Sequence, residues 1–363
     1  MSRLPCMFAA FLTALAFPAL AEEKHLNIYD WADIFDTKVL SGFTTATGIT
    51  TTYDTYDSDE ILETKLLTGT TGYDIVGPAA EPFLSREVKA GVFRELDRSK
   101  IPNWRNLDPT LMKLVEQADA GNKHAIVYGW GTTGLGYNVA AVKKRLPGVP
   151  LDSYDLLFKP EYLSKLADCG VAIIDTPTDV IPIALKYLGL DPASESPDDL
   201  QKAEQLLTAI RPSLKYINSS PITNDLADGS LCLALGWSGD VVAARNRAKE
   251  AGNGVDVAYL IPKEGTMVWM ATLAIPSDAP HPDAAHAFIN HLLDPKVAAD
   301  MVRITSFAGA VPASRQYLPA DIADDPAVFP PDSVTQTLFL PSTATQEYDR
   351  LRLRSWTRIR TGE

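Results

Sequence analysis

Two tryptophans that lie far apart in the chain each stand close to an aspartate. Trp31 comes two residues before Asp33, and Trp237 comes three residues before Asp240. An indole face attracts a cation through its ring quadrupole, and a carboxylate neutralises the positive charge. The two pairs therefore suit a small organic ammonium ion. Each pair alone is more typical of a half-buried tryptophan beside a helix-capping acid, so the placement of both pairs decides between the two interpretations.

The elements around the first pair alternate between strand and helix from residue 25 to residue 97. Strand patterns cover 25–29, 49–53 and 73–76, and helix patterns cover 38–46, 57–67 and 82–90. Gly48 is expected to end the first helix, and Asp57 to cap the second with Glu60 three residues on. This β-α-β-α-β order predicts a parallel sheet with helices on its faces.

A second α/β unit follows an extended crossing at 125–139. Its predicted strands are 171–175, 214–217 and 231–236, and its predicted helices are 162–166, 180–188, 197–210, 222–227 and 241–249. Residues 255–261 lead into a second extended crossing, which returns the chain to a strand at 267–275 and helices at 282–293 and 295–303. We expect one lobe from 22–133 and 263–315, another from 134–262, and a segment 316–363 that packs on them.

Open α/β sheets bind ligands outside the carboxyl ends of their strands. Trp31 and Asp33 follow a strand in the first lobe, and Asp179 and the segment 237–240 follow strands in the second. The two tryptophan–aspartate pairs are therefore predicted to face one cleft from opposite lobes.

The N-terminus reads as a secretory signal peptide. Arg3 precedes an uncharged apolar stretch at 4–20, and Ala19-Leu20-Ala21 fits a cleavage site before Glu22. The alternative is a membrane anchor, which the cleavage site and the charges directly after it disfavour. Cys6 precedes the apolar stretch, which argues against a lipoprotein. The protein is therefore expected in the periplasm.

Without residues 1–21 the chain has 32 Lys and Arg against 46 Asp and Glu, a net charge of −14. This balance argues against nucleic acid and anionic membrane surfaces as partners, and it is compatible with a cationic ligand. No second apolar run is long enough to span a bilayer, so no membrane insertion of the mature chain is expected.

Two cysteines, Cys169 and Cys232, remain after cleavage. In an exported protein they suggest a disulfide, which would stabilise the fold by about 4 kcal/mol in the chain-entropy model. The alternative is two buried free thiols.

Three further motifs are better explained by structure than by chemistry. The glycines of 129–134 match G-x-G-x-x-G but lead into an extended segment, so they indicate crossing backbone rather than a nucleotide site. The acids of 57–60 lack calcium-loop spacing. His281, His286 and His291 recur every five residues, which spreads them around a helix, and we expect them to be exposed. No metal, cofactor or nucleophile elbow is indicated.

The chain resembles the periplasmic polyamine-binding proteins of bacterial ABC importers, and the putrescine-binding branch most closely. The segments that carry the resemblance are 26–31, 57–62, 72–76, 90–97, 132–138, 224–229, 236–240, 246–251 and 261–265. The resemblance implies an α/β, type II periplasmic-binding-protein fold, in which two α/β lobes joined by two extended crossovers close on a ligand cleft. It implies binding rather than catalysis, and Cys169 and Cys232 match the positions of that branch's disulfide.

The family's ligand positions carry over with departures. Trp31, Asp33, Trp237 and Asp240 match directly, Trp269 falls at an aromatic position, and Asp179 stands where the branch has a glutamate. The departures are Ala32 and Ala79 in place of hydroxyl residues, Ile34 and Phe307 in place of tyrosines, and Ala271 in place of an acid that holds one terminal ammonium. The loop around Ala79 and Glu81 is one residue longer than in the branch, and Glu81 is an alternative source of the missing acid.

These residues predict a monomeric periplasmic receptor that binds a polyamine or related amine and delivers it to a membrane permease. An ammonium left without a carboxylate in a closed cleft costs several kcal/mol, so the specificity is expected to differ from that for putrescine. One alternative is a ligand with a single amine, such as an ω-amino acid or an acylated polyamine. Two alternatives from other classes are an exported cleft enzyme and a sensory binding protein.

Overall fold

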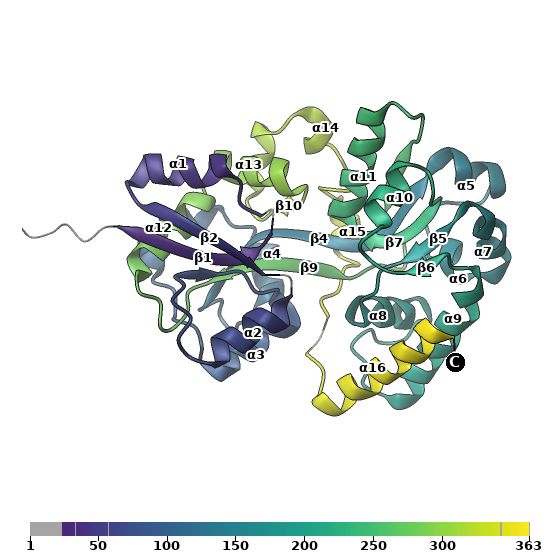
Figure 1. Ribbon diagram of the computed structural model, residues 1–363, viewed down its shortest axis with the longest axis horizontal. Coiled ribbons are helices and arrows are strands. Elements are labelled where there is room, and N and C mark those ends of the chain that lie inside the picture. Colours follow the sequence, from purple (N-terminus) through teal and green to yellow (C-terminus); the bar gives the residue numbers. More distant parts are fainter. Residues whose placement is uncertain (1–23, 33, 57, 342, 363) are drawn as a thin grey trace, which may run out of the picture.

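The computed structural model describes residues 24–32, 34–56, 58–341 and 343–362. The predicted signal peptide, Asp33 and Asp57 lie outside these residues. The first strands form the predicted parallel sheet: β1 (His25–Trp31) pairs with β2 (Thr50–Tyr56) on one side and β3 (Ile75–Val76) on the other. Helices cover both faces of this sheet (Figure 1), and their bounds are α1 (Thr37–Thr47), α2 (Asp59–Leu67), α3 (Ser85–Ala90), α4 (Pro109–Val115), α12 (Pro282–Leu292) and α13 (Pro295–Thr305).

The second unit repeats this arrangement. Its parallel strands are β5 (Val171–Ile173), β6 (Tyr216–Ile217) and β7 (Leu233–Trp237), with β5 in the middle. Its helices are α5 (Val139–Arg145), α6 (Asp155–Phe158), α7 (Pro160–Leu166), α8 (Pro177–Tyr187), α9 (Pro197–Ile210), α10 (Ile222–Ala227) and α11 (Ser238–Ala251). Each unit has its own apolar core: Phe43 and Phe288 are fully buried in the first, and Tyr154 is fully buried in the second.

One long strand, β4 (Ala125–Asn138), joins the two units. Its first half pairs antiparallel with β9 (Val268–Ala274) and β10 (Ala308–Gly309), and its second half with β7 and β8 (Val257–Leu260). The strand order is β2-β1-β3-β9-β4-β7-β5-β6. The predicted α/β fold with two extended crossings is therefore confirmed, and the G-x-G-x-x-G motif is strand backbone as expected. The precise lobe boundaries, 133/134 and 262/263, stay a prediction.

The C-terminal part of the chain follows two short helices, α14 (Ala320–Ala323) and α15 (Asp332–Thr335), and then runs between the units (Figure 1). Phe339 bonds the crossing backbone at Thr266 and Val268. The last helix, α16 (Gln346–Thr361), packs on α8 and α9. No helix among the described residues is long and apolar enough to cross a membrane.

Cys169 and Cys232 form the predicted disulfide, with their Cα atoms 5.5 Å apart. Cys169 lies two residues before β5, and Cys232 lies directly before β7. The bond therefore ties the starts of two paired strands, at the edge of the sheet opposite to their carboxyl ends.

Two local predictions were wrong. Helix α2 begins after Ser58, which is its N-cap, rather than after Asp57. His286 is buried, not exposed, because its imidazole closes a contact between α12 and a loop: Nε2 accepts the Asp97 amide at 2.9 Å, and Nδ1 donates to the Pro282 carbonyl at 2.6 Å. His281 and His291 are partly buried. No group of acids, histidines or cysteines in the described residues is arranged to hold a metal ion.

Candidate functional site

A cavity of about 630 Å³ lies between the two units, at the carboxyl ends of β1 and β7. Every predicted site residue that the structure describes lines it. These residues are Trp31, Ala32, Ala79, Glu81, Asp179, Trp237, Asp240, Trp269, Ala271 and Phe307. The volume suits a small organic molecule. The structure thus brings together side chains from positions 31 to 307, and Asp33 is the one predicted member outside the described residues.

Asp179 holds Trp237 in place. It lies in the first turn of α8, and its Oδ2 accepts two hydrogen bonds, from the Trp237 Nε1 at 3.0 Å and from the Thr133 Oγ1 at 3.0 Å. Burial raises the pKa of Asp179 to about 6, and the two hydrogen bonds oppose that rise. The Thr178 Oγ1 donates a third, long bond of 3.4 Å to Oδ1, so most of the acceptor capacity of Asp179 is used within the protein, one bond of it in orienting the indole.

Asp240 presents a free carboxylate to the same cavity. It lies in the first turn of α11, directly after the strand that ends at Trp237. No described group donates a hydrogen bond to it; burial raises its pKa, and the charge of Arg247 opposes that rise. A largely desolvated carboxylate without a partner is strongly favoured to bind a cation that enters the cavity.

Trp31, at the end of β1, and Trp269, on β9, form two further aromatic walls of the cavity. Trp31 packs against Tyr56 with ring centroids 5.1 Å apart, and its carbonyl accepts the Tyr53 hydroxyl. Trp269 meets Phe307 edge to face at 4.6 Å. Its ring lies over Gly131 of β4, where an added Cβ would come within 2.1 Å of the indole. The glycine is therefore required for the indole to lie flat on the strand.

Glu81 brings an acid to the end where Ala271 has none. A bridge between Ala79 and Ala271 places the Glu81 loop beside β9. The Glu81 Oε2 accepts Ser85 Oγ at 3.0 Å and the Thr343 hydroxyl from the C-terminal segment. Burial raises its pKa, and the two hydroxyls oppose that rise.

The comparisons with known proteins agree with this geometry. The chain matches the family of bacterial extracellular solute-binding proteins over residues 38–330. The chain belongs to this family. It is 45% identical to the putrescine-binding periplasmic protein PotF of Escherichia coli (strain K12) over 360 residues, 98% of this chain and 97% of the relative. It is 39% identical over 345 residues to a putrescine/agmatine-binding protein of Pseudomonas aeruginosa, 95% of this chain and 94% of the relative.

The fold of this solute-binding protein also matches a solved structure. The spermidine/putrescine ABC transporter substrate-binding protein PotD of Streptococcus pneumoniae superposes with a TM-score of 0.82 at 25% identity, covering 93% of this chain and 99% of that chain. The predicted type II binding-protein fold and the predicted family are both confirmed.

Several residues of this solute-binding protein that line the cavity were missed from the sequence. Asp59, which lines the cavity, was assigned to an acidic helix start. Arg86 lies on α3, and Asp349 and Arg352 lie on α16. No sequence signal places Asp349 and Arg352 of α16 at the site, because they follow Asp179 by 170 and 173 residues and only tertiary packing brings the helix there.

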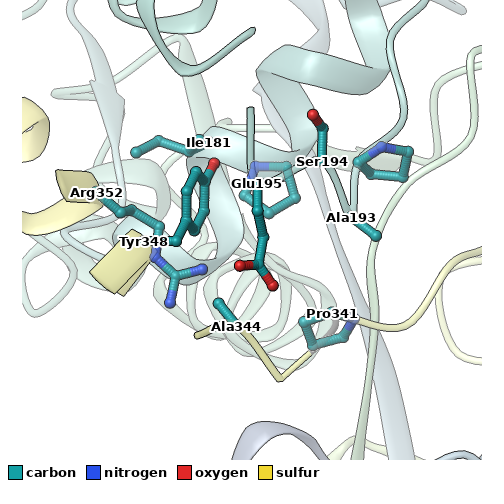
Figure 2. A pocket seen from close by; sticks show the side chains of 10 residues that line it. Ile181, Ala193, Ser194, Glu195, Pro341, Ala344, Tyr348 and Arg352 are labelled. Atoms are coloured by element: carbon teal, nitrogen blue, oxygen red, sulfur yellow. The ribbon is translucent and has the colours of Figure 1, made fainter. Parts of the chain in front are cut away.

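Helix α16 reaches the cavity while anchored on the second unit. Figure 2 shows Tyr348 and Arg352 of α16 beside Ile181 of α8, in a small pocket that Pro341 also lines. The space that these side chains leave is about 10 Å³, roughly one water molecule, so it is no second ligand site. Arg352 pairs with Asp349 at 2.5 Å, and its charge also lowers the pKa of Asp179. The helix therefore adds a neutralised ion pair, rather than a net charge, to the wall of the solute site.

Proposed function

We propose that this protein is the periplasmic component of an ABC importer, which binds a polyamine or related amine in the cavity and delivers it to a membrane permease. The names of its relatives support this role, because they are putrescine- or spermidine-binding periplasmic proteins. The signal-peptide pattern of residues 1–21 supports a periplasmic location. The proposed role is binding without a chemical step, carried out by a monomer.

One observation carries the amine assignment. The unpartnered carboxylate of Asp240 lines a cavity whose walls include three indoles, those of Trp31, Trp237 and Trp269. Aromatic rings and acids together bind an alkyl ammonium through cation–π attraction, apolar contact and charge pairing. Asp33 is a further acid in this proposal on the strength of the sequence alone.

The end of the site near Ala271 decides which kind of amine binds. Ala271 supplies no carboxylate there, which favours a specificity that differs from ordinary putrescine binding. A ligand with one amine, such as 4-aminobutyrate or N-acetylputrescine, is the second candidate, and the apolar Ala271 favours it. Glu81 in the adjoining loop favours a diamine instead, since its carboxylate lines the same end.

Titration calorimetry of the purified protein tests the proposal, with putrescine, cadaverine, spermidine, agmatine and 4-aminobutyrate as ligands. We expect at least one amine to bind with micromolar or tighter affinity. Absence of heat with every amine would contradict an amine receptor. Unchanged uptake of the bound amine in cells that lack this protein would contradict the transport role.

Asp240→Ala is the matching variant. It should weaken binding of the preferred amine by about a hundredfold or more, because it leaves a desolvated ammonium without its carboxylate. Asp198→Ala is the control, since Asp198 also lies in the first turn of a helix, α9, but is exposed and outside the cavity. Equal affinities of the Asp240 variant and the control would show that Asp240 does not bind the ligand.

A further inference from the structure

Asp59 is a buried acid that faces the cavity with most of its acceptor capacity unused. It is the first residue of α2, only 6% of its surface is exposed, and it lines the cavity. Its Oδ1 accepts the Ala79 amide at a long 3.3 Å, and no other described group donates to the carboxylate. An ionised carboxylate in this position is costly unless a cation in the cavity compensates it.

A second unpartnered acid lies behind it. Glu87 of α3 is 1% exposed, and neither of its side-chain oxygens has a hydrogen-bond partner within the described chain. The charge of Asp59 is the strongest charge that acts on Glu87. The guanidinium of Arg86, whose charge acts on both acids, is already held by Glu63 through hydrogen bonds of 2.7 and 2.9 Å. This corner of the cavity therefore holds two buried carboxyl groups that no cation of the described residues pairs with directly.

Asp59 also lies next to the position that lacks an acid. The backbone of Ala79 pairs with Ala271 on β9, and the amide of the same Ala79 donates to Asp59. One residue thus separates Asp59 from Ala271 across the cavity wall. The negative charge absent from β9 is present one element away, on α2.

We propose that Asp59 binds the second ammonium of a diamine or polyamine whose first ammonium pairs with Asp240. This inference rests on the proposed function and deepens it, because it selects a diammonium ligand over a single amine. The specificity of the site then depends on the spacing between Asp240 and Asp59 rather than on an acid at position 271.

The test compares putrescine with N-acetylputrescine, which keeps one ammonium and replaces the other with a neutral amide. Asp59→Asn keeps the shape and the acceptor for the Ala79 amide but removes the charge. We expect it to weaken putrescine binding by about tenfold or more and to leave N-acetylputrescine binding unchanged within about twofold. Asp198→Asn, in the first turn of α9, is the control and should change neither affinity.

Each other outcome overturns the inference. An equal loss of affinity for both ligands means that Asp59 acts on the fold of the site. No loss of affinity for either ligand means that another group holds the second ammonium. In both cases amine binding by the native protein still supports the proposed function. If the native protein binds no amine, both proposals fail. Asp59→Glu gives a second measurement should Asp59→Asn not fold. Its longer side chain narrows the site, so the binding preference of the protein should shift from cadaverine towards the shorter propane-1,3-diamine. An unshifted preference contradicts the assignment.

Discussion

Asp179 and Asp240 both stand in the first turn of a helix and both line the cavity, yet their carboxylates are engaged differently. Asp179 accepts the Trp237 indole and the Thr133 hydroxyl, whereas Asp240 accepts no hydrogen bond from the described residues. At the residue scale, the two acids therefore have different roles. Asp179 orients the Trp237 indole, which forms an aromatic wall, and Asp240 keeps its carboxylate for the ligand.

This division predicts different effects for two substitutions of Asp179. Asp179→Ala leaves the Trp237 N–H without an acceptor, which costs about 1–3 kcal/mol, so amine affinity should fall by about tenfold or more. Asp179→Asn keeps an acceptor oxygen and should stay within about threefold of the native affinity. Calorimetry gives both values, and tryptophan fluorescence reports whether the indole has moved. An Asn variant as weak as the Ala variant would show that the charge of Asp179, not its placement of Trp237, matters.

Strand β4 positions the site at the scale of elements. It pairs with β9 in one unit and with β7 in the other, so it carries the backbone against which Trp269 and Trp237 are registered. Gly131 pairs with Trp269, and Thr133 pairs with Trp237. Small residues on this strand leave room for indoles that a larger side chain would displace.

Gly131→Ala should therefore damage the site through packing alone. Its Cβ would come within 2.1 Å of the Trp269 ring, so the indole must shift, at a cost of about 1–3 kcal/mol in the free energy of unfolding and with a loss of amine affinity. Gly129→Ala on the same strand is the control, because its Cβ would meet Phe307 at 3.4 Å, an ordinary contact. Chemical denaturation and calorimetry of both variants test this, and equal behaviour of the two would contradict the packing argument.

The strands, the crossings and the disulfide could be predicted because their signals are local or depend on compartment. A short strand pattern predicts β1 and a run of β-branched residues predicts β2. The glycine pattern of 129–134 is predicted to be extended because it leads into an extended segment. Burial of His286 could not be predicted, since a loop from residue 97 supplies its partner. Asp59 was assigned to a helix start from its neighbours, and only the fold shows that this start faces the cavity.

At the scale of the whole molecule, three segments of chain pass between the units, and one of them restrains an acid of the site. Within the described residues these are β4, the chain between β8 and β9, and the C-terminal stretch 336–341 and 343–345. Thr343 in the last of these donates to Glu81 of the first unit, while α16 continues onto the second unit. The C-terminal segment thus links both units to the cavity wall, and the site is a property of the assembled molecule.

The buried acids around the cavity predict how stability depends on pH. Burial raises the pKa of Asp59 to about 7, of Glu87 to about 8 and of Asp179 to about 6. The folded protein therefore keeps protons that the unfolded chain has lost above about pH 5, so the free energy of unfolding falls as pH rises from about 5 to about 8. Asp59 alone should contribute on the order of 2 kcal/mol to this fall.

Other titrating groups do not reverse this direction. The pKa of Asp59 is affected by the amide of Ala79, by the charges of Glu60 and Glu63 on α2, and by the charge of Arg86 on α3. The negative charges of Asp59 and Asp30 oppose each other's ionisation. Exposed acids with lowered pKa values, such as Asp168 and Asp199, lose their stabilising effect only below about pH 4. His291, whose pKa burial lowers, acts in the opposite direction as a single group.

Thermal denaturation with and without putrescine, at about pH 5.5 and about pH 8, tests this prediction. The protein without ligand should have the higher Tm at the lower pH. Putrescine should raise the Tm more at the higher pH, because the ammonium ions stabilise the ionised carboxylates that are costly in the empty cavity. Asp59→Asn should flatten both trends, since a neutral amide neither binds nor releases the proton. If the protein without ligand had the higher Tm at the higher pH, these buried acids would not destabilise the fold when they ionise, and the prediction would be contradicted.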